Sequence, residues 1–212
     1  MILKGLICIF LSYLFGSISG SLLLGKFKNI DIRKLGSGNA GGTNALRSVG
    51  PLFALGTIII DIFKGFLPVY FLPSLINNGN PWIPVLLGVA AVIGHVYPIF
   101  YGFKGGKGAG TLVGVVMAIF PSSILIVFCT WIMILIFTGY VGLSTMCAGV
   151  SLVVITYLQY PDNSINSAFG YFTIGVSLFL FYTHRENIRR MLSGDENQFK
   201  KVMIFNKFFK NL

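Results

Sequence analysis

The chain has 212 residues, of which 55% are hydrophobic and 10% charged, and its mean hydropathy is +0.82. A soluble domain of this length cannot bury so much apolar surface, so the composition excludes a water-soluble fold and indicates a membrane protein. The net charge of +10 implies anionic partners. Because the basic residues lie in short segments between apolar stretches, membrane lipid headgroups and phosphorylated metabolites suit them better than nucleic acid does.

Seven apolar stretches follow one another along the chain, and most are long enough to cross a bilayer as helices. They run over residues 2–25, 51–72, 82–100, 108–120, 122–137, 141–160 and 167–182. The fourth and fifth stretches meet at Pro121, so they form either a tight hairpin or one kinked helix of about 30 residues.

Lysine and arginine decide between these two arrangements. Apart from Lys4 and Lys64, all of them lie in the segments 26–50 and 101–107 or in the tail after Tyr182. Such residues concentrate on the cytoplasmic side of membrane proteins, and only the hairpin places all three segments on that side. The sequence therefore predicts an all-α polytopic membrane protein with about seven transmembrane helices, the N-terminus outside and the C-terminus cytoplasmic.

The connections on the opposite face, residues 73–81 and 161–166, carry a single charge, Asp162, as expected of an external face. No repeat or shift in composition indicates a second domain, so residues 1–212 are expected to form one membrane-embedded domain. The two histidines and three cysteines share no metal-ligand spacing, and we expect neither a metal ion nor another cofactor.

The first internal connection contains the stretch GSGNAGGTNALR at residues 36–47. Glycine lets successive backbone N–H groups turn toward one anion, and Ser37, Asn39 and Asn44 add neutral donors. Arg47 adds a planar guanidinium that can hold a phosphate with two hydrogen bonds. The pattern favours a phosphate site, and a flexible polar connector is the alternative.

The second internal connection, GHVYPIFYGFKGGKG at residues 94–108, stands directly before an apolar helix. In its GGKG run, backbone amides and a lysine meet the positive N-terminus of that helix, which suits a phosphate. A Walker A motif requires Ser or Thr after the lysine, so nucleotide chemistry is not expected. The alternative is a glycine-rich hinge whose lysines only mark the cytoplasmic side.

Two further internal segments carry polar residues. In residues 138–145, Ser144 offers a hydroxyl that is expected to line the same cavity. The tail begins HRENIRRMLSGDE at residues 184–196, where His184 and Asn187 share one helical face just below the membrane. A basic helix lying on lipid headgroups is the alternative for this segment.

Asp61 and Lys64 lie three residues apart on one face of the second apolar stretch. Charges inside a membrane are costly and usually paired, so the spacing predicts a local ion pair, with a proton relay as the alternative. His95 stands near the end of the third stretch, where we expect it to hold its loop.

The loop GSGNAGGTNALR, the run GHVYPIFYGFKGGKG and the tail HRENIRRMLSGDE together resemble the acyl-phosphate:glycerol-3-phosphate acyltransferase family of bacteria, the PlsY type. The resemblance spans the whole chain. It implies seven helices in the inner membrane and transfer of a fatty acyl chain from acyl phosphate to the sn-1 hydroxyl of glycerol 3-phosphate. The product is lysophosphatidic acid.

Carried over to this chain, the resemblance and the loop chemistry define two groups of site residues. The catalytic group is Ser37, Arg47, Lys107, His184 and Asn187. The group that binds substrate or phosphate is Asn39, Asn44, Lys104, Gly105, Gly106, Gly108 and Ser144, with Lys104 placed there by position alone. Two residues depart from the family pattern: Gly42 replaces the alanine of G-A-T-N, and Gly142 replaces the first serine of V-S-L-S.

Acyl phosphate is a mixed anhydride whose phosphate leaves readily, so positioning and charge neutralisation should dominate the reaction. The attacking hydroxyl loses its proton either to His184 or to a phosphate oxygen of a substrate. An acyl-CoA-dependent enzyme is expected to carry H-x-x-x-x-D, which neither histidine begins. A transporter of an anionic phosphorylated metabolite is the main alternative, although it calls for more polar residues at mid-membrane depth. The basic tail leaves room for transient contact with a soluble enzyme that makes acyl phosphate.

Overall fold

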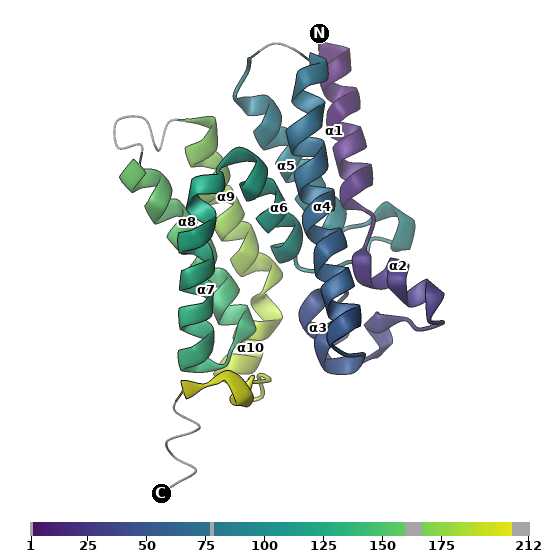
Figure 1. Cartoon of the computed structure of the whole chain (residues 1–212), viewed down its shortest axis with the longest axis vertical. Coiled ribbons are helices and arrows are strands. Elements are labelled where there is room, and N and C mark those ends of the chain that lie inside the picture. Colours follow the sequence, from purple (N-terminus) through teal and green to yellow (C-terminus); the bar gives the residue numbers. More distant parts are fainter. Residues whose placement is uncertain (1, 77–78, 160–166, 205–212) are drawn as a thin grey trace, which may run out of the picture. The chain divides into compact units, whose positions relative to one another are not determined.

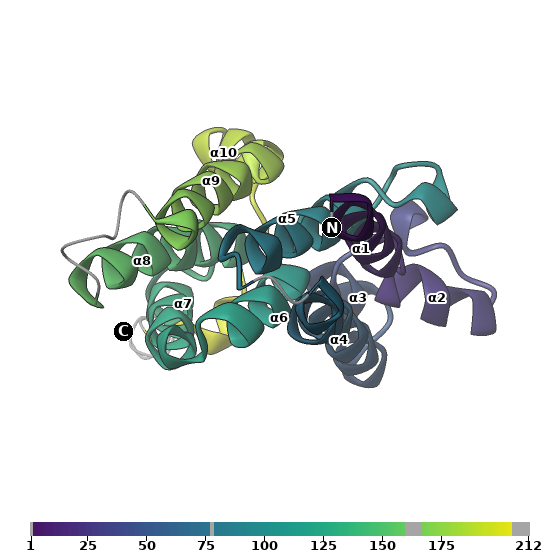
Figure 2. The same ribbon diagram turned by 90° about the horizontal axis from the view of Figure 1, so that it is seen from above.

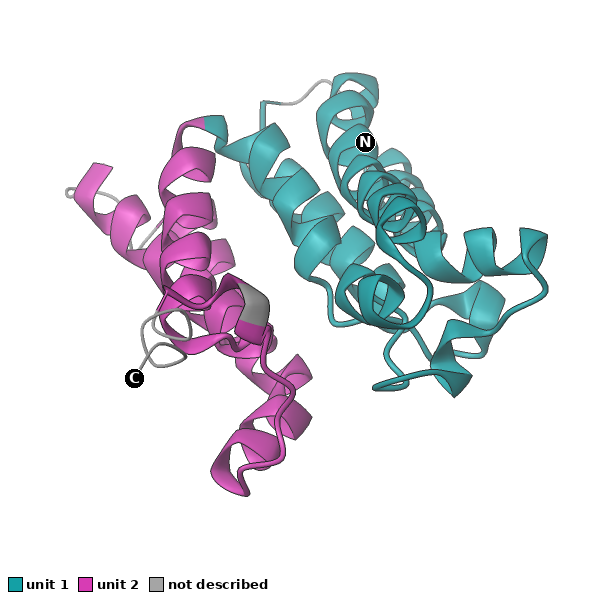
Figure 3. Ribbon diagram, turned by 60° about the horizontal axis from the view of Figure 1, so that its bottom comes forward, with its two compact units in different colours: residues 1–121 teal, residues 122–212 magenta. Residues whose placement is uncertain are grey.

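The computed structural model describes residues 2–76, 79–159 and 167–204, and every regular element in these ranges is a helix. The all-α prediction is therefore confirmed. The chain divides into two compact units, residues 1–121 and residues 122–212 (Figure 3). A single membrane-embedded domain over the whole chain stays a prediction.

The first unit is built around two pairs of helices. Helix α1 packs along α5, and α4 packs along α6, as Figures 1 and 2 both show. The elements in chain order are α1 (Ile2–Gly16), α2 (Gly20–Phe27), the 3-10 helix η1 (Ile32–Lys34), α3 (Gly42–Ser48), α4 (Pro51–Ile76), α5 (Trp82–Val96), η2 (Ile99–Tyr101) and α6 (Ala109–Ile119).

Glycine allows both pairs to approach closely. A Cβ atom at Gly16 would collide with the backbone of Ala91, and one at Gly65 with the carbonyl of Thr111. In a membrane, helices associate through close van der Waals packing because lipid tails are as apolar as the side chains they would replace. The small residues therefore determine where these helices cross.

The first apolar stretch, predicted as one helix, is two. Helices α1 and α2 meet at an angle of 50° across residues 17–19. The break leaves the carbonyl of Ile18 without a donor and the amide of Gly20 without an acceptor in either helix, and both bond to the ion pair of α4. Lys64 Nζ donates to Ile18 O at 2.8 Å, and Gly20 N donates to Asp61 Oδ1 at 3.2 Å.

The second unit packs α8 (Val141–Gln159) against both α7 (Ile124–Thr138) and α9 (Ala168–Thr183). The short helix α10 (Arg185–Leu192) follows α9 after a break at His184. A 3-10 helix, η3 (Pro121–Ser123), leads into α7, and another, η4 (Lys200–Val202), lies near the end of the described chain.

Within the described ranges, four helices are long and apolar enough to span a membrane, and the bent pair α1 and α2 adds a fifth candidate. Helices α6 and α9 are apolar but shorter. The predicted break at Pro121 is present, since α6 ends at Ile119 and a 3-10 turn follows. Seven crossings and the orientation stay predictions; residues 161–166, Lys207 and Lys210, on which part of that argument rested, lie outside the described residues.

Candidate active site

The two glycine-rich loops of the first unit line one open hollow. Gly38 comes from the first loop, and Asp31 and Arg33 come from η1 and its cap just before that loop. The second loop contributes Tyr101, Gly102, Lys104 and Gly105. Segments that are about 70 residues apart in sequence thus face the same space. Of the residues predicted for the site, Lys104 and Gly105 are among those that line it.

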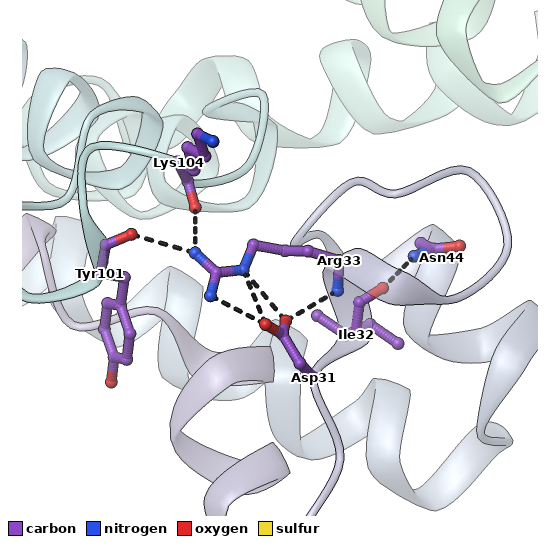
Figure 4. Close-up of polar contacts among 6 residues, drawn as sticks. All are labelled: Asp31, Ile32, Arg33, Asn44, Tyr101 and Lys104. Carbon is purple, nitrogen blue, oxygen red and sulfur yellow. Dashed lines mark hydrogen bonds and ion pairs between the residues drawn. The ribbon is translucent and has the colours of Figure 1, made fainter.

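Arg33 joins the two loops (Figure 4). Its Nη1 donates to the carbonyls of Tyr101 at 3.0 Å and Lys104 at 3.5 Å. Its Nε and Nη2 donate to the carboxylate of Asp31, the closer contact being 2.9 Å. Asp31 also accepts from the backbone amide of Arg33 and so caps η1. The hydrogen bonds from Arg33 lower the pKa of the Asp31 carboxyl below its ordinary value.

Asn44 organises the first loop from inside. Its side chain is 1% exposed, and Nδ2 donates to the carbonyls of Ile32, Leu35 and Asn39 at 2.9 to 3.1 Å. Its Oδ1 accepts from the amide of Ser37 at 2.9 Å. One side chain therefore satisfies backbone groups around the whole turn. The structure gives Asn44 a loop-holding role, and a contact with substrate stays a prediction.

The other residues predicted in the first loop lie nearer its surface. Ser37 and Arg47 are exposed, Asn39 is half-buried, and Arg47 stands in the last turn of α3. Gly36 and Gly38 flank Ser37 with φ of 54° and 72°, a left-handed backbone that glycine adopts without strain. The loop thus presents Ser37 and Arg47 outward from a backbone that Asn44 fixes.

In the second loop, the amides of Gly105 and Gly106 are not directed toward the phosphate position predicted from the sequence. Gly105 N donates to Val96 O and Gly106 N to His95 O, both at 3.1 Å, so these amides bond to the end of α5. A phosphate contact by either glycine stays a prediction, but their amides already have acceptors. The N–H groups of the first turn of α6 have no acceptor within their own helix and remain the backbone donors of this region.

Gly108 caps the N-terminus of α6 in a left-handed conformation, with φ of 89°, which a side chain would strain. The two lysines of the loop both precede this cap. Lys107 is half-buried, and Lys104 is exposed with its ammonium group directed away from the Arg33 guanidinium (Figure 4). The carbonyl of Lys104 therefore accepts the hydrogen bond from Arg33 that joins the two loops, whereas its side chain extends away from this contact.

In the second unit, His184 is buried at the break between α9 and α10. Its Nδ1 lies 2.8 Å from the carbonyl of Leu180 and 3.3 Å from the hydroxyl of Thr183. A carbonyl only accepts hydrogen bonds, so the bond to Leu180 places a proton on Nδ1. In the neutral ring, Nε2 is then the nitrogen that can accept a proton.

Asn187 belongs to a second buried cluster on α10. Its Nδ2 donates to Glu196 Oε1 at 2.7 Å, and Arg190 Nε donates to Glu196 Oε2 at 2.6 Å. Gly142 of α8 lies against this cluster, because a Cβ atom there would stand 3.0 Å from Cβ and Cγ of Asn187. Ser144 is buried too, and its hydroxyl donates at 2.8 Å to the carbonyl of Tyr140, the residue just before α8.

Sequence reasoning missed the residues that hold the predicted ones in place. Arg33 was counted only among the basic residues of the first internal connection, and neither Asp31 nor Glu196 was predicted to have a role. The one available signal was the close spacing of an acid and a base at Asp31 and Arg33. The structure brings the two loop motifs together within the first unit, and His184 and Asn187 together within the second; their convergence on one substrate stays a prediction.

The fold and these loops define an integral membrane protein, whose regular elements in the described ranges are all helices and whose polar chemistry suits a phosphorylated ligand. Residues 6–194 match the family model described as Glycerol-3-phosphate acyltransferase, and the chain belongs to this family. A glycerol-3-phosphate acyltransferase of Aquifex aeolicus is 36% identical over 93% of this chain and 100% of its own length. One from Halalkalibacterium halodurans is 39% identical over 88% of this chain and 91% of its own.

Solved structures agree with this assignment. The crystal structure of PlsY (YgiH), an integral membrane glycerol 3-phosphate acyltransferase, in its glycerol 3-phosphate form is 36% identical to this chain with a TM-score of 0.84. The alignment covers 92% of this chain and 95% of the PlsY chain. Its lysophosphatidic acid form gives 34% identity and a TM-score of 0.82 over the same shares.

Proposed function

We propose that this chain transfers a fatty acyl group from acyl phosphate to the sn-1 hydroxyl of glycerol 3-phosphate and releases lysophosphatidic acid and inorganic phosphate. Family membership supports the acceptor. The structural observation that carries the proposal is the hollow that both glycine-rich loops line, with Lys104 at its edge. We place the enzyme in the bacterial inner membrane, with seven crossings and the site facing the cytoplasm, because the basic segments concentrate on one predicted side.

In the reaction, the sn-1 oxygen attacks the carbonyl carbon of the acyl phosphate, a new ester bond forms, and the bond from that carbon to the phosphate oxygen breaks. The phosphate leaves readily, so the protein mainly has to hold two phosphate groups close together and offset their charge. We assign this task to Arg47, Lys104, Lys107 and the first turn of α6. Ser37 and Asn39 supply neutral donors.

The hydroxyl proton passes either to an oxygen of a substrate phosphate or to Nε2 of His184. The bond from His184 to Leu180 supports the second route more than the sequence did, since it orients the ring without a carboxylate. We place Asn187 and Ser144 beside His184 as polar wall residues. Membrane lipid surrounds the helices, and the basic tail is the surface we would assign to a soluble acyl-phosphate-synthesising enzyme.

Parallel incubations of purified protein with glycerol 3-phosphate and three donors test the proposal. Acyl phosphate should give lysophosphatidic acid, whereas acyl-CoA and acyl-carrier-protein thioesters should not. Product from a thioester alone would refute the donor assignment. Vesicles loaded with labelled glycerol 3-phosphate test the transport alternative, because a transporter releases the label intact and the enzyme converts it into lipid.

Arg47→Ala provides the residue-level test. A hydrogen bond to a charged group contributes roughly 1.5 to 3 kcal/mol, so one lost contact should lower substrate affinity or rate by about tenfold or more. Lys28→Ala is the matched control, because it removes an exposed positive charge from the same connection outside the proposed site. Equal turnover by the two variants would remove Arg47 from the site.

A further inference from the structure

A buried cluster of ionisable side chains lies directly beneath the second glycine loop. Lys64 Nζ and Asp61 Oδ1 on α4 are 2.8 Å apart, which confirms the ion pair predicted from their spacing. The same Asp61 oxygen lies 3.5 Å from Nδ1 of His95 on α5. All three residues are at most 3% exposed. The reaction as proposed uses none of them.

Through His95 the cluster contacts the second glycine loop. The carbonyl of His95 accepts from Gly106 N, and the imidazole lies so close to Gly106 that a Cβ atom there would collide with Nε2 and stand 2.9 Å from Cε1. A Cβ atom at Gly105 would collide with the His95 carbonyl. The two glycines are therefore required by contact with His95, and the imidazole ring forms the surface on which the loop rests.

On its other sides the cluster is enclosed by backbone. Asp61 accepts from Gly20 at the break between α1 and α2, and Lys64 donates to Ile18 on the same break. The first turn of α6 also touches Asp61, since a Cβ atom at Gly110 would lie 3.2 Å from Asp61 Cβ. One carboxylate thus contacts the imidazole below the loop and the helix that begins after it.

We propose that His95, whose ring lies 3.5 Å from the carboxylate of the Asp61–Lys64 ion pair, is a positioning residue. It fixes the position of the loop 105–108 and of the first turn of α6. It thereby sets the affinity for the phosphate of glycerol 3-phosphate. The inference rests on the proposed function, because it takes this loop as part of the phosphate site. An ion pair that only stabilised the helices would leave substrate affinity unchanged.

A double-mutant cycle tests the contact without any acyl transfer. In detergent, Gly106→Ala alone should lower the thermal midpoint because its methyl meets the ring. Adding His95→Ala removes the ring, so the double variant should lose less than the sum of the two single losses. Gly175→Ala is the control, since a Cβ atom there meets nothing within 4 Å. Additive losses would overturn the contact.

Kinetics test the positioning role. His95→Ala should raise the KM for glycerol 3-phosphate by about tenfold, the equivalent of one typical hydrogen bond, while kcat changes less. His95→Gln, which keeps an amide near the position of Nε2, should recover part of the loss. A variant that carries both Asp61→Asn and Lys64→Met removes the two charges together and should show the same rise in KM.

An unchanged KM in folded His95→Ala, or a fall in kcat alone, would overturn the proposal. A failure of the proposed function gives a different result. In that case the wild-type protein forms no lysophosphatidic acid from any donor, whereas the double-mutant cycle still shows coupling between His95 and Gly106.

Discussion

Asn44→Asp changes one atom type at the centre of the first loop and leaves the shape of the side chain intact. In the wild-type chain, Nδ2 donates to three carbonyls, those of Ile32, Leu35 and Asn39. In the variant, a carboxylate oxygen faces these three acceptors. The contact in which Ser37 N donates to Oδ1 can survive, so the substitution isolates the donor half of the network.

The expected cost follows from the burial of the site. Two N–H donors are lost at about 1 kcal/mol each. The carbonyls of Ile32 and Leu35 keep their backbone donors, Leu35 N and Gly38 N, but the carbonyl of Asn39 loses the donor that Asn44 supplies, which adds roughly 1 to 3 kcal/mol. The sum of about 3 to 5 kcal/mol corresponds to at least a hundredfold shift away from the native loop conformation, because 1.4 kcal/mol is about a factor of ten. Ser37 and Arg47 stand on this loop and should lose their positions with it.

The assay is acyl transfer at saturating and at limiting glycerol 3-phosphate, together with the thermal midpoint in detergent. Asn29→Asp is the matched control, because it makes the same change of charge at an exposed position in the same connection. The control should retain wild-type behaviour, whereas Asn44→Asp should lose about a hundredfold in kcat/KM. If both variants keep full activity and stability, the loop does not depend on the Asn44 amide and the reasoning fails.

The remaining predictions concern the second unit and the contact between Asp31 and Arg33. Gly142→Ser, which restores the serine common in the family, should reduce activity, since its Cβ would lie 3.0 Å from Asn187; a gain in turnover would show that Asn187 can shift freely. His184→Ala should abolish turnover if Nε2 is the obligatory base, and unchanged turnover assigns the proton to a substrate phosphate. Asp31 has a lowered pKa, so its contribution to stability is complete above the ordinary value of about 3.9 and is lost as the pH falls through the lowered value. The difference in thermal midpoint between wild type and Asp31→Asn should therefore be constant from pH 7 to pH 5 and shrink in stronger acid, and a difference that shrinks already at neutral pH would contradict this account.

The spacing of residues within one helix predicted the contacts that depend only on the geometry of that helix. The three-residue separation of Asp61 and Lys64 indicated an ion pair, and the pair is present at 2.8 Å. The same pattern could not reveal His95, because its approach depends on how α5 packs in the first unit. Glycine-rich composition likewise identified both loops as special but not the direction of their amides. Gly105 and Gly106 donate to α5 because its last carbonyls lie within reach, and carbonyl positions are a property of the fold.

Asn44 illustrates the same limit in another way. The sequence presented it as one of several neutral donors, equivalent to Asn39 and Ser37. Only the turn between η1 and α3 shows that its side chain points inward and theirs do not. Arg33 was interpreted as a charge on the cytoplasmic side, and its bonds to a loop nearly 70 residues away depend on tertiary structure. Sequence patterns therefore predicted candidate polar residues for a site, but not the contacts that hold these residues in place.

The break between α1 and α2 has a consequence for how the protein enters the membrane. Ribosomes complete these helices well before α4, whose Lys64 and Asp61 bond to the carbonyl of Ile18 and the amide of Gly20. Hydrocarbon tolerates no such backbone groups without partners. These two backbone groups therefore gain their partners only once α4 has been made and has packed against the N-terminal helices. The ion pair thus joins two segments of the chain that are synthesised at different times.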